Sequence, residues 1–268
     1  MGERRTVVQV EVPRERAELA ADALWRAGPS AVLEVDLPGD RVRLTADVAD
    51  PGQVGLEWAP VVVAVDDDAY LDAWRTWAAP VRAGRRVVLR PAWTEAEPAA
   101  AGDVVVVLDP GRAFGSGSHE STRLAVALLE DHVRPGDRVL DVGCGSGVLS
   151  VLVCRLGAAG ATAVDHAAEA VEATLANAAA NGVGDRVTAS QTPVREVKGA
   201  FDLVVANIGG PVLWELAADL VGRVAQGGRL VLSGVLEDRL DALVAAYPGC
   251  DELARVAEAG WAAVALRR

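Results

Sequence analysis

From about residue 121 to the carboxyl end, short apolar runs alternate with longer stretches in which apolar residues recur at helical spacing. The runs predict strands and the longer stretches predict helices. Strands are expected at 137–143, 161–165, 186–190, 201–207 and 228–234, and helices at 121–133, 147–157, 167–182, 211–224 and 237–247. This alternation predicts an α/β, Rossmann-like fold with a mostly parallel sheet covered on both faces. The last two segments, 252–260 and 261–268, predict an antiparallel pair.

The first 66 residues follow a different pattern, with one helical stretch among period-two segments. Strands are expected at 6–12, 31–37, 41–48 and 59–65, and a helix at 13–28. This order predicts a small α+β domain over residues 1–66. The second helix of a ferredoxin-like unit would have to form within residues 50–58, which are too few and too rich in turn residues, so we expect a truncated version.

A helical connector is expected at 67–84, because a run of aspartates suits a helix start. Its aromatic residues Tyr70, Trp74 and Trp77 share one helical face, which favours packing between the domains over contact with a substrate. Segments 85–93 and 103–110 then predict strands. The remaining domain is expected to span 85–268.

Composition excludes several classes of protein. The net charge of −12 and the pI near 4.8 disfavour nucleic-acid binding, which depends on cationic contacts to phosphates. Three scattered cysteines fit neither a disulfide framework nor a zinc site, and we expect no metal. No apolar run is long enough to span a membrane, and the charged opening is no signal peptide. A cytoplasmic protein, with a monomer favoured, is therefore expected.

A glycine-rich turn, "DVGCGSGVLS" at 141–150, joins a predicted strand to a predicted helix. A dinucleotide fingerprint started at Gly143 would need glycine at 148, where Val148 stands, and no P-loop lysine is present. Asp141 precedes the glycines, where a carboxylate opposes a pyrophosphate but suits a cationic or hydroxyl-bearing ligand. Gly143 and Gly145 allow close backbone approach to that ligand. The D-x-G-x-G-x-G form is characteristic of methyltransferases that use S-adenosyl-L-methionine (SAM).

Two further polar residues are expected at the same edge of the sheet. Asp165 ends the next predicted strand, 22 residues after Gly143, where a carboxylate can bind ribose hydroxyls; the alternative is a helix cap. Asn207 ends the fourth predicted strand and offers both an amide donor and a carbonyl acceptor. Ligands of open α/β sheets bind beyond these strand ends.

The segment "LDPGRAFGSGSHEST" at 108–122 contains three glycines, several hydroxyl residues and His119. Ser116, Ser118 and His119 could form a nucleophile and base, but no G-x-S-x-G elbow lies at a strand–helix turn, which disfavours a hydrolase. His119 has two interpretations, a hydrogen bond within the loop or an active-site role. Cys144 is expected to be a small packing residue.

With these motifs, the chain from about residue 70 onward resembles the ribosomal protein L11 methyltransferase family. The most specific pieces are "LDPGRAFGSGSHEST", "DVGCGSGVLS", "LGAAGATAVD", "NAAANGV" and "VVANIGGPVL". The resemblance implies a seven-stranded class I methyltransferase sheet preceded by a small ferredoxin-like domain. It implies N-methylation of a protein amine, lysine ε-amino or N-terminal, and cofactor contacts by Thr122, Gly143, Asp165 and Asn207. Asn207 and His119 are the candidate catalytic residues.

The sequence also departs from the family pattern, chiefly in the part expected to bind the substrate. The amino-terminal domain is expected to lack a helix, and "NIGGPVL" stands where the family usually has "NILAGPL". Ribosomal protein L11 is the expected partner. Two alternatives stay open: a class I methyltransferase of a small molecule or other peptide, and a SAM-binding protein without turnover.

Overall fold

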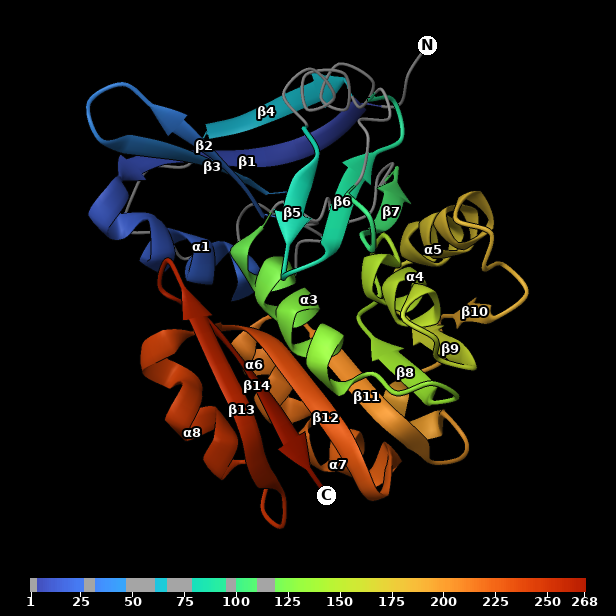
Figure 1. Cartoon of the computed structure of the whole chain (residues 1–268). Coiled ribbons are helices and arrows are strands. Elements are labelled where there is room, and N and C mark those ends of the chain that lie inside the picture. Colours follow the sequence, from blue (N-terminus) through green and yellow to red (C-terminus); the bar gives the residue numbers. More distant parts are fainter. Residues whose placement is uncertain (1–3, 27–31, 47–60, 67–78, 95–99, 110–118) are drawn as a thin grey trace. The chain divides into compact units, whose positions relative to one another are not determined.

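The computed structural model describes residues 4–26, 32–46, 61–66, 79–94, 100–109 and 119–268 (Figure 1). The chain divides into two compact units, Met1–Ala78 and Ala79–Arg268. Within the described ranges, no helix combines the length and the apolar character needed to cross a membrane.

The amino-terminal unit contains one antiparallel sheet of four strands in the order β2-β3-β1-β4. Its elements are β1 (Arg4–Pro13), a short 3-10 turn (Arg14–Arg16), α1 (Ala17–Arg26), β2 (Val32–Leu37), β3 (Arg41–Ala46) and β4 (Val61–Asp66). This is the strand order of a ferredoxin-like unit, and the predicted hairpin of β2 and β3 is confirmed. Residues 47–60, where the absence of a second helix was predicted, lie outside the described residues.

The core of this unit follows from period-two patterning. Val8, Val10 and Val12 of β1 are buried, as are alternate residues of β3. Ala17, Ala20 and Leu24 are buried one helical turn apart on α1 and belong to the same apolar cluster. One face of the sheet therefore packs against one face of α1.

The second unit contains the predicted seven-stranded sheet, in the order β10-β9-β8-β11-β12-β14-β13. Its strands are β8 (Arg138–Val142), β9 (Gly160–Val164), β10 (Val187–Ser190), β11 (Phe201–Asn207), β12 (Val224–Leu236), β13 (Asp251–Glu258) and β14 (Trp261–Arg267). The first five strands are parallel, whereas β14 is antiparallel to both β12 and β13. The α/β fold class and the antiparallel pair at the carboxyl end are confirmed.

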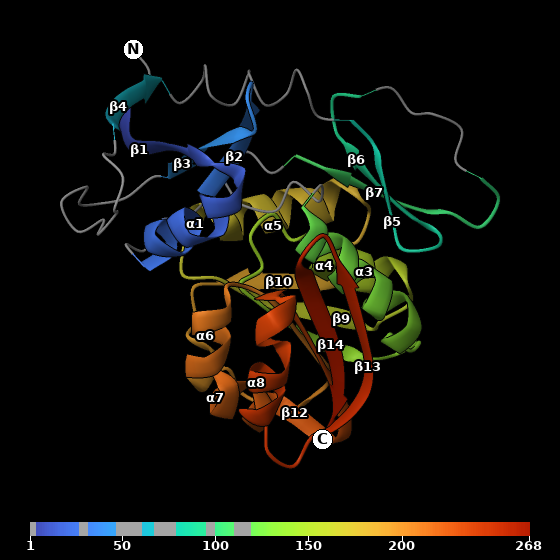
Figure 2. The same cartoon turned by 90° about the vertical axis from the view of Figure 1, so that its left-hand side faces the viewer.

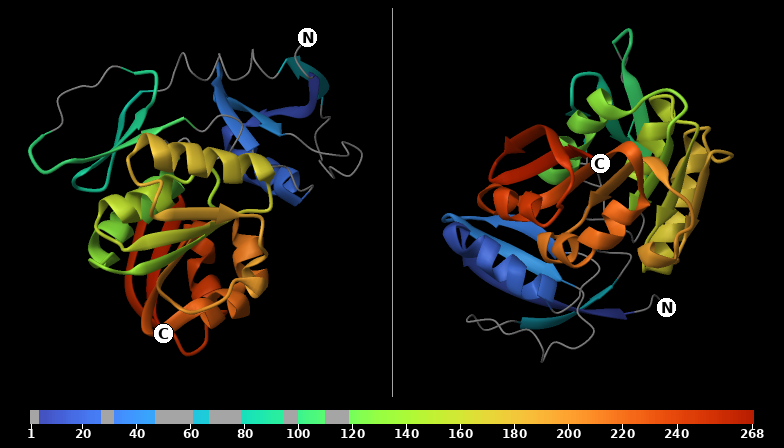
Figure 3. Two further views of the ribbon diagram at one scale, coloured as in Figure 1. Left: turned by 90° about the vertical axis from the view of Figure 1, so that its right-hand side faces the viewer. Right: turned by 90° about the horizontal axis from the view of Figure 1, so that it is seen from below.

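Helices cover both faces of this sheet (Figure 2 and Figure 3). One face packs with α3 (Glu120–His132), α4 (Val148–Arg155) and α5 (Ala168–Ala180). The other packs with α6 (Gly210–Glu215), α7 (Ala217–Arg223) and α8 (Leu240–Ala245). In β11, Leu203 and Val205 face the first layer, and Val204 and Ala206 face the second. Burial on both faces explains why these strands read as continuous apolar runs.

A separate three-stranded sheet precedes α3. Its first strand lies within the predicted helical connector 67–84, so the prediction of a helix is wrong for the end of that segment. The sheet consists of β5 (Val81–Ala83), β6 (Val87–Pro91) and β7 (Val104–Leu108) in that order. Residues 67–78 of the connector, with Tyr70, Trp74 and Trp77, lie outside the described residues. The end of the connector is not helical, because Gly84 adopts φ +73° and the hairpin turn that follows donates two backbone N–H groups to the carboxylate of Glu130 on α3.

The helix predicted at 211–224 is interrupted at Leu216 and forms α6 and α7 instead. The hydroxyl of Tyr247 donates to the carbonyl oxygen of Leu213 at 2.7 Å. A continuous helix would use that carbonyl for the N–H of Ala217. A side chain that inserts into the hydrogen-bond ladder breaks a helix at that point.

Candidate functional site at the carboxyl edge of the sheet

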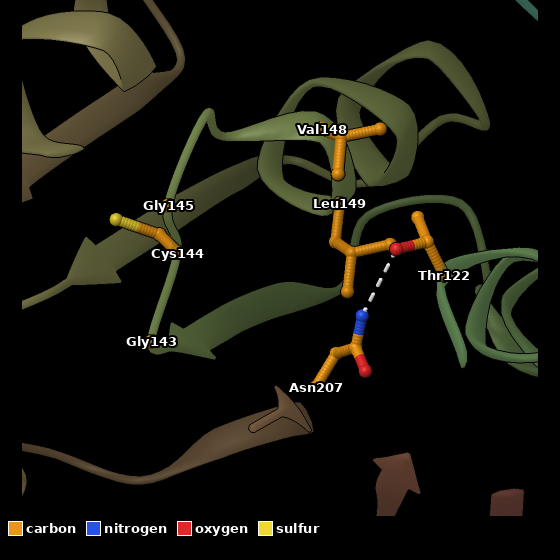
Figure 4. Close-up of a pocket in the computed structure, with 7 residues that line it drawn as sticks. All are labelled: Thr122, Gly143, Cys144, Gly145, Val148, Leu149 and Asn207. Carbon is orange, nitrogen blue, oxygen red and sulfur yellow. Dashed lines mark hydrogen bonds between the residues drawn. The ribbon is translucent and has the colours of Figure 1, made fainter. Parts of the chain in front are cut away.

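A pocket lies at the carboxyl edge of the seven-stranded sheet, where the strand order reverses. β9 and β10 extend the sheet on one side of β8, and β11 and β12 extend it on the other. Ligands of open α/β sheets bind at such a switch point. The pocket is lined by Thr122, Gly143, Cys144, Gly145, Val148, Leu149 and Asn207 (Figure 4).

Three glycines form the turn from β8 into α4. Gly143, Gly145 and Gly147 have φ angles of +73°, +51° and +77°, a region that disfavours residues with a side chain. A Cβ atom on Gly143 would collide with Cγ2 of Ile208. The turn therefore requires glycine, and it brings backbone close to the pocket with no side chain between.

Asp165 follows β9 and holds this turn in place. The N–H of Gly145 donates to its Oδ2 at 3.0 Å, and the N–H of Ala167 donates to its Oδ1 at 3.0 Å. Each carboxylate oxygen can accept more than one hydrogen bond, so acceptor capacity remains for a ligand hydroxyl. Asp165 thus supports the entry into α5 and also lies one hydrogen bond from a residue that lines the pocket.

Asp141 lies beneath the glycine turn and does not line the pocket. Its side chain is buried, and Ser150 on α4 donates through Oγ to its Oδ2 at 2.7 Å. Within the described part of the chain, its buried Oδ1 has no hydrogen-bond partner. Burial raises the pKa of Asp141 to about 6, against the bonds from Ser150 and with a smaller contribution from the charge of Asp165. When ionised, Asp141 is an incompletely satisfied negative charge below the turn.

Asn207 ends β11 on the opposite side of the pocket. Its Nδ2 donates to Oγ1 of Thr122 on α3 at 3.2 Å, which joins two elements 85 residues apart (Figure 4). No described group donates to its Oδ1, and the side chain is half-buried. The amide is therefore fixed at its nitrogen while its oxygen keeps its capacity to accept.

His119 is placed at the start of α3 and does not line the pocket. Its Nδ1 accepts from the N–H of Ser121 at 3.2 Å and lies 2.8 Å from the hydroxyl of Ser121. Its ring packs edge-on against Trp261, with centroids 4.9 Å apart. Burial lowers the pKa of His119, which favours the neutral ring. The helix cap and the ring contact agree with the first interpretation of His119, a hydrogen bond within the chain, and its catalytic role stays a prediction.

The structure thus brings four of the predicted residues, Thr122, Gly143, Gly145 and Asn207, to one pocket. The sequence analysis did not predict that Val148 and Leu149 line the pocket. Their position could have indicated it, because they are the first two helical residues after the glycines. Cys144 also lines the pocket but is buried, in keeping with a packing residue. Ser116, Ser118 and the glycines at 111, 115 and 117 lie outside the described residues.

Comparisons with known proteins agree with this architecture. The family model described as "Ribosomal protein L11 methyltransferase (PrmA)" matches residues 57–268. A ribosomal protein L11 methyltransferase of Pelotomaculum thermopropionicum is 43% identical over 206 residues, covering 76% of this chain and 67% of that protein. One of Sorangium cellulosum is 37% identical over 266 residues, covering 92% and 84%.

Among solved structures, the ribosomal protein L11 methylase of Lactobacillus delbrueckii subsp. bulgaricus superposes with a TM-score of 0.66 at 30% sequence identity. The match covers 71% of this chain and 99% of that one. Sequence and fold therefore give the same answer: this chain belongs to the ribosomal protein L11 methyltransferase family.

Proposed function

We propose that this protein transfers methyl groups from SAM to an amine of ribosomal protein L11. One observation carries the proposal: a glycine-lined pocket at the switch point of the sheet faces an asparagine whose carbonyl oxygen can accept a hydrogen bond. Relatives named as ribosomal protein L11 methyltransferases, which match up to 92% of the chain, support the choice of substrate.

The described residues fit SAM better than a phosphate-bearing cofactor. The left-handed glycine turn lines the pocket with backbone at Gly143 and Gly145, and a Cβ atom at Gly143 would collide with Ile208. Asp165 offers acceptor capacity for ribose hydroxyls next to that turn. Below the turn, Oδ1 of Asp141 has no hydrogen-bond partner among the described residues, which favours a positively charged ligand and would repel a pyrophosphate. We assign Thr122, Asp141, Gly143, Gly145, Asp165 and Asn207 to the cofactor site, with Asp141 acting through charge.

The residues of the chain then have to position an amine. SAM, when bound, supplies a methyl group activated by a positively charged sulfur. An amine attacks only through a free lone pair, so it must be neutral. Among the described residues, none of the seven that line the pocket is a carboxylate or a histidine, so we infer that the amine loses its proton before it enters. Oδ1 of Asn207 would accept from an N–H of that amine and orient its lone pair.

His119 is a weaker catalytic candidate. Its contacts to Ser121 and Trp261 favour a structural role at the start of α3, from which Thr122 projects into the pocket. Because the proposed substrate is a ribosomal protein, we propose that the reaction takes place in the cytoplasm, and we favour a monomer acting on this protein partner. The alternatives are a small molecule or other peptide as acceptor, and SAM binding without turnover.

The decisive experiment is mass spectrometry of ribosomal protein L11 from the same organism after incubation with this protein and SAM. We expect a mass gain of one or more methyl groups, which should be much slower with the variant Asn207→Ala. Calorimetry of that variant with SAM separates its loss of turnover from any loss of cofactor affinity. SAM binding without any mass gain would contradict the proposed substrate and move the search to other amines. Failure to bind SAM would contradict the cofactor assignment.

A further inference from the structure

Two asparagines on one face at the end of α5, Asn177 in its last turn and Asn181 just after it, bind the backbone at the end of β7. Asn177 and Asn181 are four residues apart, and both are buried. Oδ1 of Asn177 accepts from the N–H of Asp109 at 2.9 Å, while its Nδ2 donates to the carbonyl oxygen of Asp109 at 2.9 Å. Asn181 makes the same pair of bonds to Val107, at 2.8 and 2.7 Å. The two side chains therefore replace a neighbouring strand along the outer edge of β7.

The match follows from the geometry of the two elements. Four residues of helix rise about 6 Å, and two residues of strand advance about 6.6 Å, so positions i and i+4 on α5 meet alternate residues of β7. On its other edge, β7 pairs with β6, and the carbonyl of Leu108 accepts from Ala92. Val107 and Asp109 thus turn their polar backbone groups toward α5, where they need partners.

The two asparagines differ in one contact. The second Nδ2 hydrogen of Asn177 is donated to the carbonyl oxygen of Ser146 in the glycine turn, at 2.8 Å. The corresponding hydrogen of Asn181 is donated within α5, to the carbonyl oxygen of Asn177 at 2.8 Å. Only Asn177 therefore links β7 to the turn that lines the pocket.

Ser146 lies in a part of the turn that has little conformational preference of its own. The glycines on both sides of it, Gly145 and Gly147, have positive φ, and glycine backbone is permissive. Thr174, also on α5, donates to the carbonyl oxygen of Gly145 at 3.1 Å. Side chains of α5 therefore fix two successive carbonyl groups of the turn.

We propose that Asn177 is a positioning residue for the cofactor site, which fixes the glycine turn through Ser146 and ties it to β7. Asn181 holds β7 to the same helix but has no part in the turn. This inference rests on the proposed function, in which the glycine turn binds SAM. The two asparagines of "NAAANGV" would then have different roles, since only the first contacts the glycine turn.

The test compares Asn177→Ala with Asn181→Ala, which removes an equivalent pair of bonds to β7 and serves as the matched control. Both variants should lower the thermal unfolding midpoint, because each leaves partly buried backbone groups at the end of β7 unpaired. In calorimetry, Asn177→Ala should weaken SAM binding by about tenfold, since the turn loses one buried hydrogen bond that fixes it. Asn181→Ala should retain the affinity of the natural protein.

Hydrogen exchange of the turn, measured without SAM, is the second readout. Backbone N–H groups of Gly143, Cys144, Gly145 and Gly147 are all hydrogen-bonded, so a loosened turn should exchange faster. We expect faster exchange at 143–147 in Asn177→Ala only. Equal SAM affinity and equal exchange in the two variants would overturn the inference. If the natural protein binds no SAM, the proposed function fails, and the exchange data still decide the role of Asn177.

Discussion

The two sides of the pocket are built in different ways. On the glycine side, backbone groups are held from several directions: Asp165 accepts from Gly145, and Thr174 and Asn177 donate to the carbonyls of Gly145 and Ser146. On the other side, Asn207 is held through its nitrogen by one 3.2 Å bond to Thr122.

The difference separates two tasks that one pocket has to perform. A turn fixed by several hydrogen bonds keeps its shape before a ligand arrives, which lowers the entropic cost of ordering it on binding. An amide held at one atom leaves its oxygen available to an incoming group. Changes on the glycine side should therefore alter SAM affinity first, and changes at Asn207 should alter turnover first.

The largest effect is expected from Gly143→Ala. The new methyl group would collide with Ile208, a β-branched side chain with little freedom to move, and φ at this position is +73°. We expect SAM affinity to fall by roughly 100-fold, equivalent to about 3 kcal/mol, which calorimetry would measure.

Gly136→Ala is the matched control for this variant. Gly136 has φ +85°, yet a Cβ atom there would meet nothing within 4 Å. Both variants carry the backbone strain of a positive φ, but only Gly143→Ala adds a collision at the pocket. Equal losses of SAM affinity would mean that strain, and not the shape of the glycine side, determines binding.

The second prediction concerns the charge beneath the glycine turn. Asp141 has a folded pKa of about 6, above its ordinary value of 3.8, because burial disfavours the ionised form. The folded state therefore binds more protons than the unfolded state between these values, and this group makes the protein less stable as pH rises through that window. Asp141→Asn removes this destabilising ionisation and should stabilise the protein by about 3 kcal/mol at pH 7.

Denaturant unfolding across that pH range measures this effect as the difference between the natural protein and Asp141→Asn. The difference should be small near pH 4 and should grow until about pH 6. Glu169→Gln, which removes one exposed negative charge from α5, controls for net charge. Parallel stability curves for the natural protein and Asp141→Asn would contradict the assignment of a buried, costly charge.

Much of the fold could be predicted because local patterning and tertiary packing agree. The strands of the seven-stranded sheet were expected from apolar runs that two helical layers bury, and the helix layers from their spacing. Predictions failed where a distant side chain determined the backbone. The hydroxyl of Tyr247 interrupts the helix at Leu216, and the carboxylate of Glu130 binds the turn after β5. Neither contact leaves a sign in the local sequence.

The candidate site was predictable for a related reason. Gly143, Asp165 and Asn207 follow parallel strands, and the carboxyl ends of such strands meet at one edge. The direction of the Asp141 side chain, below the turn, could not be predicted from residue spacing. Neighbouring residues of a strand point to opposite faces of the sheet, and the sequence pattern does not show on which face the ligand binds. Nor could it pair Asn177 with Asp109, since that contact depends on how α5 packs against β7.

The smallest effect is expected on the less constrained side of the pocket. Thr122→Val keeps the shape of the side chain but removes the acceptor that holds Nδ2 of Asn207. We expect kcat to fall about fivefold, as for the loss of one hydrogen bond worth about 1 kcal/mol. In the Asn207→Ala background, Thr122→Val should not lower kcat further, because the hydrogen bond between the two side chains is already absent. Additive losses would show that Thr122 acts by a route independent of Asn207, and SAM affinities of the same variants would reveal whether that route is a direct contact with the cofactor.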